Sequence, residues 1–335
     1  MSGSLTFKIR YGYAAMYKRR IYKPIQLPKA VDLQELGAEV RIYGEVEGNM
    51  KQFNPSIAWH DGELFISIRS CNFGVERHGK WYLRDGSAYS KTDVLIGRIY
   101  PDSLNLTLLD KLELSEDTPL VTKLAGLEDV RLFSRKDGLH AIGFESDRIT
   151  RSLHNKSATL AEYIVKGNEL KYLRTLEKPD FEVVEKNWQP TDEPTKAFDF
   201  TYSPTQVWRG GDVEGDKYEG NIHGGSQLLK QKDGTYLSLV HEKLLDPKLA
   251  NAYNRASNIY DKYIYYTYLA KHDKNGIVTQ LSKPFRFGTH ENIEFASGMV
   301  EHEGNMIISL GIRDCKYAIV KISKEKLMGL FEEVE

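Results

Sequence analysis

One short pattern of apolar and polar residues recurs along the chain: an alternating stretch, a turn containing Asp-Gly or a similar pair, and a second alternating stretch. Its clear copies are PSIAWHDGELFISI, VRLFSRKDGLHAIGF, SQLLKQKDGTYLSLV and SGMVEHEGNMIISL, and a weaker copy is NWQPTDEPTKAFDFTYS. Asp-Gly between alternating segments predicts a β-hairpin, because a type I′ turn needs positive φ at both of its central residues. We therefore expect hairpin turns at Asp61-Gly62, Asp137-Gly138, Glu193-Pro194, Asp233-Gly234 and Glu303-Gly304.

Further strand-like segments between these hairpins, such as DVLIGRIY and YIYYTYLAKH, add strands to each of them. Five such units predict an all-β, five-bladed β-propeller that forms a single domain over residues 1–335. In this interpretation residues 1–50 close the last blade, residues 51–320 contain the blade repeats and residues 321–335 form a C-terminal helix. No Pro/Gly/Ser-rich linker divides the chain. A β-sandwich of similar length is the competing architecture.

Helical patterns are sparse, and we expect only short helices at the periphery. The candidates are LQELGAEV near Leu33, residues 247–260 and the closing segment KEKLMGLFEEVE. In the closing segment, Leu327, Leu330 and Phe331 recur at the i, i+3 and i+4 spacing of an apolar helix face.

The chain is almost electrically neutral, with 46 Lys and Arg against 47 Asp and Glu. This balance argues against a surface built to neutralise nucleic-acid phosphates, although a local basic patch is compatible with it. Hydrophobic residues make up 41% of the chain, which is enough for a sizeable core and too much for a disordered chain. The 20 Tyr, 13 Phe and 4 Trp favour β-structure and also supply surfaces on which sugar rings or bases can stack.

Localisation follows from the apolar runs and the cysteines. The chain has no run of eighteen apolar residues, and its first thirty residues lack the apolar core of a signal peptide. Cys71 and Cys315 are too few for a disulfide framework or a zinc site, and two free thiols fit a reducing compartment. We therefore expect a cytoplasmic protein that has no membrane partner.

In a propeller the innermost strand of each blade lines the central axis, so equivalent positions of the five repeats should converge there. The positions before the first hairpin strand carry Asn54; Glu128, Asp129 and Arg131; Lys186, Asn187 and Trp188; His223 and Ser226; Glu294 and Ser297. The ends of the second strands carry Arg69, Glu145, Tyr202, His241, Arg313 and Asp314. Each side chain alone fits a solvated cap or an ion pair, and for Glu145 and Tyr202 that interpretation stays open. Polar groups at these positions in every repeat indicate a ligand site on the axis.

The candidate residues suit carbohydrate chemistry. Paired carboxylates are typical of glycoside chemistry, in which one acid protonates the leaving oxygen. Arg69, Arg148, His241 and Tyr253 carry donors that suit sugar hydroxyls or a phosphate oxyanion. The sequence contains no metal-ligand spacing, P-loop, GxGxxG, GxSxG or HExxH motif, so we expect neither a metal nor an organic cofactor.

Several of these segments, taken in order, resemble glycoside hydrolase family 130, the mannoside phosphorylases and the related β-mannosyltransferases. The resemblance rests on FNPSIAWHDGELFISIR, GLEDVRLF, GGSQLL with GTYLSLVH, and SGM with SLGIRDC, and it covers about residues 50–320. The family's Glu-Asp-Pro-Arg motif is Glu-Asp-Val-Arg in this chain. The chain is therefore similar to an outlying member, and the resemblance implies a five-bladed propeller that acts on carbohydrate.

The resemblance also implies a role for individual residues. Asp129 would be the general acid, which protonates the glycosidic oxygen directly or through a sugar hydroxyl while phosphate attacks from the opposite face. The sugar-binding residues would be Asn54, Arg69, Glu128, Arg131, Asn187 and Asp314, and the phosphate-binding residues would be Arg148, His241 and Tyr253. One protein carboxylate is enough for this inverting mechanism, because phosphate needs no general base. Inorganic phosphate or a sugar phosphate would be the co-substrate.

A nucleotide-sugar-dependent glycosyltransferase is an alternative. After Arg148 the nearest further cations are Lys166 and Lys171, and a lysine does not replace the two-pronged contact of an arginine. The segment from Tyr11 to Lys23 interleaves tyrosines with cations, which suits a nucleotide or a nucleic-acid acceptor and equally suits a solvated edge strand.

Other functions stay open as well. A hydrolase would need a base for water, and Glu145 or Glu294 would serve if it faced the axis. A propeller that binds sugar without catalysis is a further alternative. We expect a carbohydrate partner, leave a nucleic-acid acceptor and a homo-oligomer open, and cannot name the sugar from the sequence.

Overall fold

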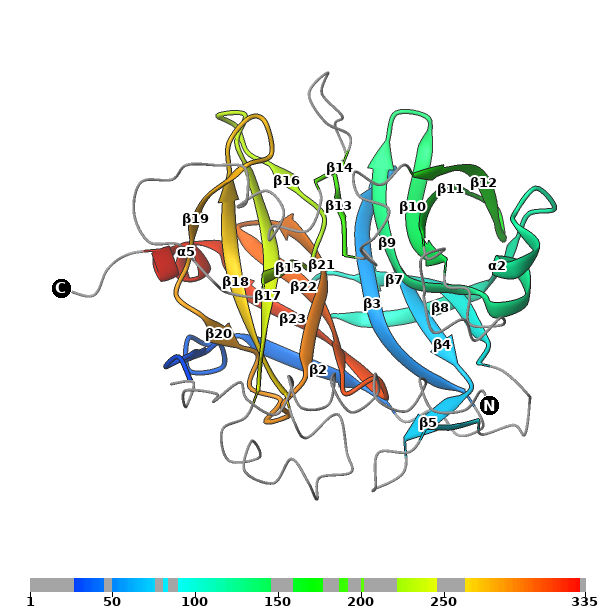
Figure 1. Ribbon diagram of the computed structural model, residues 1–335. Coiled ribbons are helices and arrows are strands. Elements are labelled where there is room, and N and C mark those ends of the chain that lie inside the picture. The colour runs from blue at the N-terminus through cyan, green and yellow to red at the C-terminus, as the bar shows by residue number, and fades with distance from the viewer. Residues whose placement is uncertain are drawn as a thin grey trace, which may run out of the picture.

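The computed structural model describes residues 27–44, 50–75, 81–83, 90–145, 159–176, 187–191, 200–201, 222–245 and 263–331. Strands predominate in these ranges (Figure 1). The described helices are short: α2 (Leu120–Ala125), α5 (Lys324–Met328) and the 3-10 helix η2 (Gly329–Phe331). None of the helices in these ranges is long and apolar enough to span a membrane.

Two four-stranded antiparallel units form the first sheet. One unit contains β3 (Lys51–His60), β4 (Glu63–Cys71), β7 (Thr92–Tyr100) and β8 (Asn105–Leu114). The other contains β9 (Leu127–Arg135), β10 (Gly138–Glu145), β11 (Thr159–Lys166) and β12 (Glu169–Leu176). Their outer strands β8 and β12 pair in parallel over two residue pairs, so the eight strands count as one sheet.

Four further sheets occur in the described residues. A short pair is formed by β13 (Gln189–Pro190) and β14 (Phe200–Thr201), and a second by β5 (Phe73–Val75) and β6 (Trp81–Leu83). The next sheet contains β15 (Ile222–Gly224), β16 (Leu229–Lys230), β17 (Tyr236–Leu245), β18 (Tyr263–His272), β19 (Val278–Leu281), β20 (Phe285–Arg286) and β1 (Val31–Asp32). The last contains β21 (Glu294–His302), β22 (Asn305–Ile312), β23 (Lys316–Ser323) and β2 (Glu39–Tyr43).

Strands of neighbouring units lie against one another: β21 packs against β3, β3 packs against β9, and β17 packs against β21. Figure 1 shows β3 and β9 side by side near the middle of the molecule. The apolar cores lie between neighbouring sheets, as Ile57 and Ile66 of one sheet and Ile307 of the next illustrate. The chain is therefore an all-β propeller. The number of five blades stays a prediction, because the region of the third hairpin lies largely outside the described residues.

Two of the predicted hairpins have the expected type I′ geometry. Both central residues have positive φ at Asp61-Gly62 (49° and 80°) and at Glu303-Gly304 (45° and 76°). At Asp233-Gly234 only the glycine does, and the Asp233 carboxylate accepts a hydrogen bond from the Thr235 amide. At Asp137-Gly138 the glycine already belongs to β10. The turn at Glu193-Pro194 lies outside the described residues.

The helical prediction for LQELGAEV was wrong. Leu33 to Gly37 form turns, and the segment then enters β2. Gly37 has φ of 83°, and the Ala38 amide donates a hydrogen bond to the Leu33 carbonyl. The turn therefore ends at Gly37 and does not continue as a helix. At the other end of the chain, α5 and η2 bury Leu327 and Leu330 as the apolar spacing predicted. The candidate helix at residues 247–260 lies outside the described residues.

Candidate active site at the propeller axis

Irregularities in the innermost strands carry the polar residues that the sequence placed on the axis. The pairing of β3 with β4 shifts between Phe53 and Ser56, and the pairing of β9 with β10 shifts beside Asp129. Asn54 and Asp129 have φ of 46° and 49°, in the left-handed region that Asn and Asp tolerate better than most residues. Such bulges turn a side chain away from the regular alternation of a strand. The backbone therefore directs Asn54 and Asp129 toward each other instead of into the blades.

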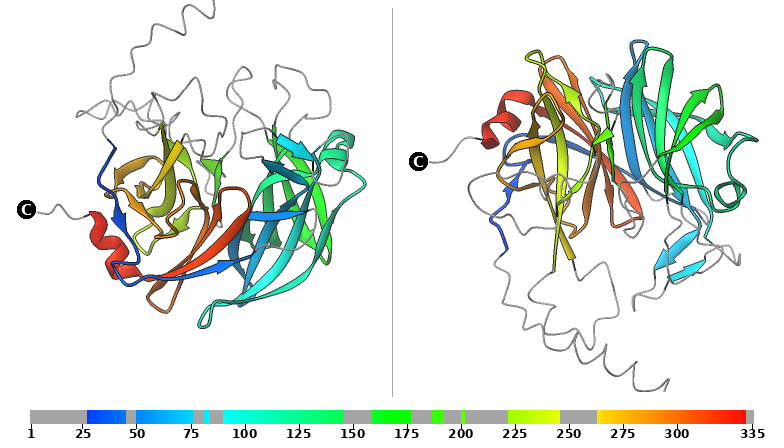
Figure 2. Two further views of the ribbon diagram at one scale, coloured as in Figure 1. Left: turned by 90° about the horizontal axis from the view of Figure 1, so that it is seen from below. Right: turned by 45° about the horizontal axis from the view of Figure 1, so that its top comes forward.

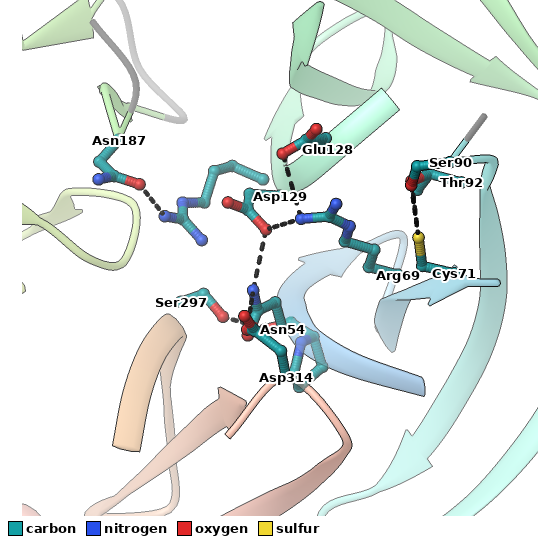
Figure 3. A network of polar contacts seen from close by, with 12 residues as sticks. Asn54, Arg69, Cys71, Ser90, Thr92, Glu128, Asp129, Asn187, Ser297 and Asp314 are labelled. Atoms are coloured by element: carbon teal, nitrogen blue, oxygen red, sulfur yellow. Dashed lines mark hydrogen bonds and ion pairs between the residues drawn. The ribbon is translucent and has the colours of Figure 1, made fainter. Parts of the chain in front are cut away.

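Asp129 lies at the centre of a buried polar network (Figure 3). Its Oδ1 accepts a hydrogen bond of 2.9 Å from Asn54 Nδ2 and one of 3.0 Å from Arg69 Nη1. Asn54 Nδ2 also lies 3.5 Å from Asp314 Oδ1. Three four-stranded units, which belong to two sheets, thus contribute to one cluster.

Arg69 is buried between two carboxylates. Its Nη1 lies 3.3 Å from Glu128 Oε2 and 3.0 Å from Asp129 Oδ1, and its guanidinium lies 5.0 Å from the centre of the Phe53 ring. Burial alone would lower the pKa of Arg69, but the charges of Glu128 and Asp129 outweigh burial and raise that pKa. Arg69 is a fixed cation that holds Asp129 in place.

Asp314 comes from the turn between β22 and β23, where Arg313 and Asp314 both have φ of 49°. Gly311, at the end of β22, allows Asn54 to pack close to this turn. A Cβ atom at Gly311 would lie only 1.9 Å from Asn54 Oδ1 and 2.8 Å from the Asn54 amide nitrogen. The approach of Asn54 to Asp314 therefore depends on glycine at position 311.

Arg131 reaches across the axis from β9. Its Nη2 donates to Asn187 Oδ1 at 3.3 Å, and its guanidinium lies 5.0 Å from the centre of the Phe295 ring. Burial lowers the pKa of Arg131 to about 10, which the charge of Asp129 only partly offsets. Asn187 has φ of 72°, so it occupies a left-handed conformation like Asn54 and Asp129.

His241 lies among aromatic rings on the same axis. Its ring stacks on Tyr265 at 5.3 Å with an interplanar angle of 8°, and it meets Phe295 edge to face at 5.0 Å. His223 is a further neighbour at 5.4 Å. Burial, followed by the charges of Asp314 and Asp129, raises the pKa of the Tyr265 hydroxyl. The aromatic group is thus electrostatically connected with the carboxylates.

Sequence reasoning missed Tyr265 and Phe295. Phe295 touches both Arg131 and His241, and Tyr265 covers one face of His241. The only signal for Tyr265 was the run of tyrosines in β18, where Tyr263 and Tyr265 alternate with buried residues. Phe295 reads as an ordinary apolar strand residue.

Several predicted residues cannot be placed. Arg148 and Tyr253, the two proposed partners of His241 in phosphate binding, lie outside the described residues. The same holds for Tyr202 and for the segment from Tyr11 to Lys23. The structure therefore brings together the predicted sugar-binding residues Asn54, Arg69, Glu128, Asp314, and Arg131 with Asn187, and places His241 beside them.

The two glutamates considered as bases accept hydrogen bonds from neighbouring segments. Glu145 accepts hydrogen bonds from Thr122 Oγ1 of α2 at 2.9 Å and from the Tyr163 hydroxyl at 2.8 Å. Glu294 accepts hydrogen bonds from the Thr289 amide and hydroxyl and from the Phe287 amide, in the loop after β20.

One group of metal-ligating side chains occurs away from the axis. Asp102, His302 and Glu303 have ligand atoms within 4.8 Å of one another, and they lie on hairpin turns of neighbouring sheets. Asp102 and Glu303 are exposed. None of the three belongs to the Asp129 network.

The solved structures that align with this chain include mannoside phosphorylases and a mannosyltransferase. A structure from the glycoside hydrolase family 130 of mannoside phosphorylases, described with hydrolases that target β-1,2 mannosidic linkages in Candida mannan, aligns with a TM-score of 0.58 and 13% identity over 84% of this chain and 91% of its own. The β-1,2-mannobiose phosphorylase of Listeria innocua aligns with a TM-score of 0.53 and 14% identity, over 88% of this chain and 99% of its own. A GDP-Man-dependent mannosyltransferase of Leishmania mexicana aligns with a TM-score of 0.54 and 14% identity, over 98% of each chain.

No protein-family model and no curated protein matches the chain by sequence. The agreement at this low identity concerns the fold, which is the one that the sequence resemblance implied. The fold is therefore that of the mannoside phosphorylases and of the related mannosyltransferase.

Proposed function

We propose that the chain is an inverting glycosyl-transferring enzyme in which Asp129 is the general acid. One observation carries this proposal: Asp129 is the point at which donors from different strands meet, on a bulged backbone that directs it to the axis. A carboxylate held this way is pre-organised for one task. The shared fold with glycosyl-transferring enzymes supports the same reaction class.

Two hydrogen bonds to Oδ1, from Asn54 and Arg69, fix the orientation of the Asp129 carboxyl group. In the reaction the carboxyl proton of Asp129 moves to the glycosidic oxygen, and the bond from that oxygen to the anomeric carbon breaks. A phosphate oxygen forms the new bond from the opposite face, so the configuration inverts.

Phosphate or an activated sugar fits the site better than water as the second reactant. Phosphate is already a nucleophile, whereas water needs a base. Glu145 and Glu294, the bases considered for hydrolysis, already accept hydrogen bonds from neighbouring side chains and amides. Phosphorolysis, or transfer from a sugar phosphate, is therefore the function that the arrangement supports best.

A nucleotide-sugar-dependent transferase is the second candidate. The GDP-Man-dependent mannosyltransferase aligns over 98% of both chains, whereas the Listeria innocua phosphorylase aligns over 88% of this chain. Asp129 would then act as the base that accepts the proton of the acceptor hydroxyl.

The test is a time course with α-mannose 1-phosphate, α-glucose 1-phosphate and GDP-mannose against a panel of mono- and disaccharide acceptors. Phosphate release with formation of a β-linked product supports phosphorylase chemistry, and consumption of GDP-mannose alone supports the second candidate. Binding of sugars without any product would make the chain a non-catalytic sugar-binding propeller.

Asp129→Asn separates catalysis from folding. We expect turnover to fall roughly 100- to 10,000-fold, because proton transfer is lost while the amide keeps the size of the carboxyl group. Asp110→Asn, on the exposed strand β8, is the matched control and should keep full activity. Full activity of the Asp129→Asn enzyme, at an unchanged melting temperature, would sink the assignment.

A further inference from the structure

Two arginines are buried at the axis, and their surroundings differ. Arg69 has Glu128 and Asp129 within ion-pair distance. Arg131 is 2% exposed and has a neutral amide oxygen as its hydrogen-bond acceptor, that of Asn187. Among the residues that the structure describes, its Nε and Nη1 have no acceptor, and no carboxylate lies within ion-pair distance of it. No described carboxylate therefore neutralises the positive charge of Arg131 by direct contact.

An unpaired buried guanidinium is costly, because it has lost its water and has gained little in return. A guanidinium offers five N–H groups, of which Asn187 accepts one. The ring of Phe295 covers one face at 5.0 Å and fixes the plane of the group. The remaining donors thus lie in a fixed plane beside Asp129.

We propose that Arg131 is the binding residue for an oxyanion, the phosphoryl group of the co-substrate, in the axial site. Arginine suits this role because its planar donors match the oxygens of a phosphoryl group, and because a bound anion supplies the charge that the protein does not. The inference rests on the proposed function for the identity of the anion, and it changes the role that the sequence suggested for Arg131, which was sugar binding.

The depressed pKa of Arg131 agrees with this role, because an anion in contact would stabilise the charged form that burial disfavours. Asp129, by contrast, has Arg69 as its cation in direct contact. An incoming phosphoryl group can therefore approach Arg131 without having to compete for the cation that holds the general acid.

The experiment measures binding without turnover, so that it does not depend on catalysis. The full chain, in phosphate-free buffer, is titrated calorimetrically with inorganic phosphate, with mannose 1-phosphate and with mannose, and its melting temperature is recorded with each. We expect the two phosphates to bind and raise the melting temperature, and mannose to bind no more tightly in the wild type than in the variants. Binding of mannose 1-phosphate without inorganic phosphate identifies the sugar phosphate as the source of the group.

Arg131→Met removes the charge and keeps an apolar chain against Phe295. Phosphate affinity should fall roughly tenfold to a hundredfold, since charge-assisted hydrogen bonds are lost. The melting temperature without phosphate should not fall, because the variant no longer buries an unpaired charge. Arg131→Lys keeps the charge but has fewer, differently placed donors, and should show an intermediate loss.

Arg135→Met is the matched control, because Arg135 lies on the same strand, also 5.0 Å from the centre of a ring, and has Glu162 at 3.8 Å. Its phosphate affinity should stay at the wild-type value. Unchanged phosphate affinity in Arg131→Met overturns the proposal. A second result also overturns it: neither phosphate binds the wild type, and Arg131→Met melts at a lower temperature than the wild type. Arg131 would then be a structural residue. Loss of turnover in Asp129→Asn with phosphate binding retained bears on the proposed function alone.

Discussion

Arg69 and Glu128 belong to a set of buried charges whose removal should be far more costly than the loss of an exposed pair. Both side chains are less than 10% exposed, and Arg69 serves Glu128 and Asp129 together. An ion pair of this kind contributes little net stability while it is complete, but losing one partner leaves uncompensated charges in the interior. The cost of a substitution therefore depends on which charge stays behind.

Arg69→Met should destabilise the protein by about 3–5 kcal/mol, because it leaves two carboxylates buried without their cation. Urea unfolding of the single variants and of the double variant Arg69→Met/Glu128→Gln provides the measurement. The double variant should recover part of the loss, since one of the stranded carboxylates is then neutral. Additive losses in the double variant would show that the two side chains do not interact.

The sequence was sufficient to find the centre of the site but not its surroundings. Asn54, Asp129 and Asp314 stood out because each repeat has a polar group at the corresponding place, and the structure brings them together. Tyr265 and Phe295 could not be found this way, because their contacts with His241 and Arg131 depend on how neighbouring blades pack. The sequence pattern predicts the strands of a single blade but not the contacts between blades.

At the scale of elements, the close approach of β22 to the bulge in β3 is a condition for the site. Gly311→Ala would place a methyl group 1.9 Å from Asn54 Oδ1 and 2.8 Å from the Asn54 amide, and rotation of the side chain relieves only the first clash. We expect a loss of roughly 1–3 kcal/mol in stability and a lower catalytic rate. Gly329→Ala, where nothing lies within 4 Å, is the control and should leave both unchanged. Normal turnover in Gly311→Ala would contradict a positioning role for Asn54.

His272, on β18, makes the stability of its sheet depend on pH. Its Nδ1 donates to the Gly276 carbonyl, so its Nε2 accepts from the Ser238 hydroxyl, and the buried ring is neutral. Burial lowers the pKa of His272 to about 4 from its ordinary 6.5. As the pH falls, His272 is protonated in the unfolded chain before it is protonated in the folded one. The free energy of unfolding is therefore highest above pH 6.5 and decreases by about 3 kcal/mol as the pH drops toward 4.

The measurement is urea unfolding between pH 4 and pH 8 for the wild type and for His272→Gln. The variant should lose a large part of the pH dependence between 6.5 and 4.5, even if it is less stable throughout. His302→Gln, at the end of β21 where the side chain is 21% exposed, should keep the wild-type slope. Equal slopes for the wild type and His272→Gln would show that this histidine does not cause the effect.

Strands could be predicted from the sequence where the two strands of one hairpin are neighbours in the chain. Asp61-Gly62 and Glu303-Gly304 form the turns that their sequences favour. The segment LQELGAEV failed, because its apolar spacing fits a helix while Val40 pairs with Val320 in the last sheet. A strand that is completed by a distant partner gives no local signal of that partner.

At the scale of the whole molecule, the N-terminal strands hold together sheets that come late in the chain (Figure 2). β2 is the fourth strand of the last sheet, and β1 pairs in parallel with β20. Leu33, between them, belongs to the same apolar core as Leu327 and Leu330. The N-terminal region is thus part of the structure that carries Asp314.

A chain that begins at residue 45 should lose cooperative unfolding or melt at least about 10 °C lower than a chain that begins at residue 27. The physical reason is that the last sheet then exposes β23 as an edge, and the core around Leu33 opens. Thermal melting followed by circular dichroism compares the two. A synthetic peptide of residues 27–44 should restore part of the difference, and equal melting of both chains would refute a closing role for β1 and β2.

Because the chain is synthesised from its N-terminus, the pairing of β1 and β2 with the late sheets is delayed. Lys326 Nζ donates to the Leu36 carbonyl across a separation of 290 residues, so the first described strands leave the ribosome long before their partners exist. Contacts this distant in sequence slow folding, and unpaired strands that wait for a partner are prone to aggregate. The blade that bears Asp314 can be completed only after β23, at residues 316–323, has been synthesised. A nascent chain arrested before β23 should therefore bind no sugar and should be a preferred client of chaperones, whatever the state of its earlier blades.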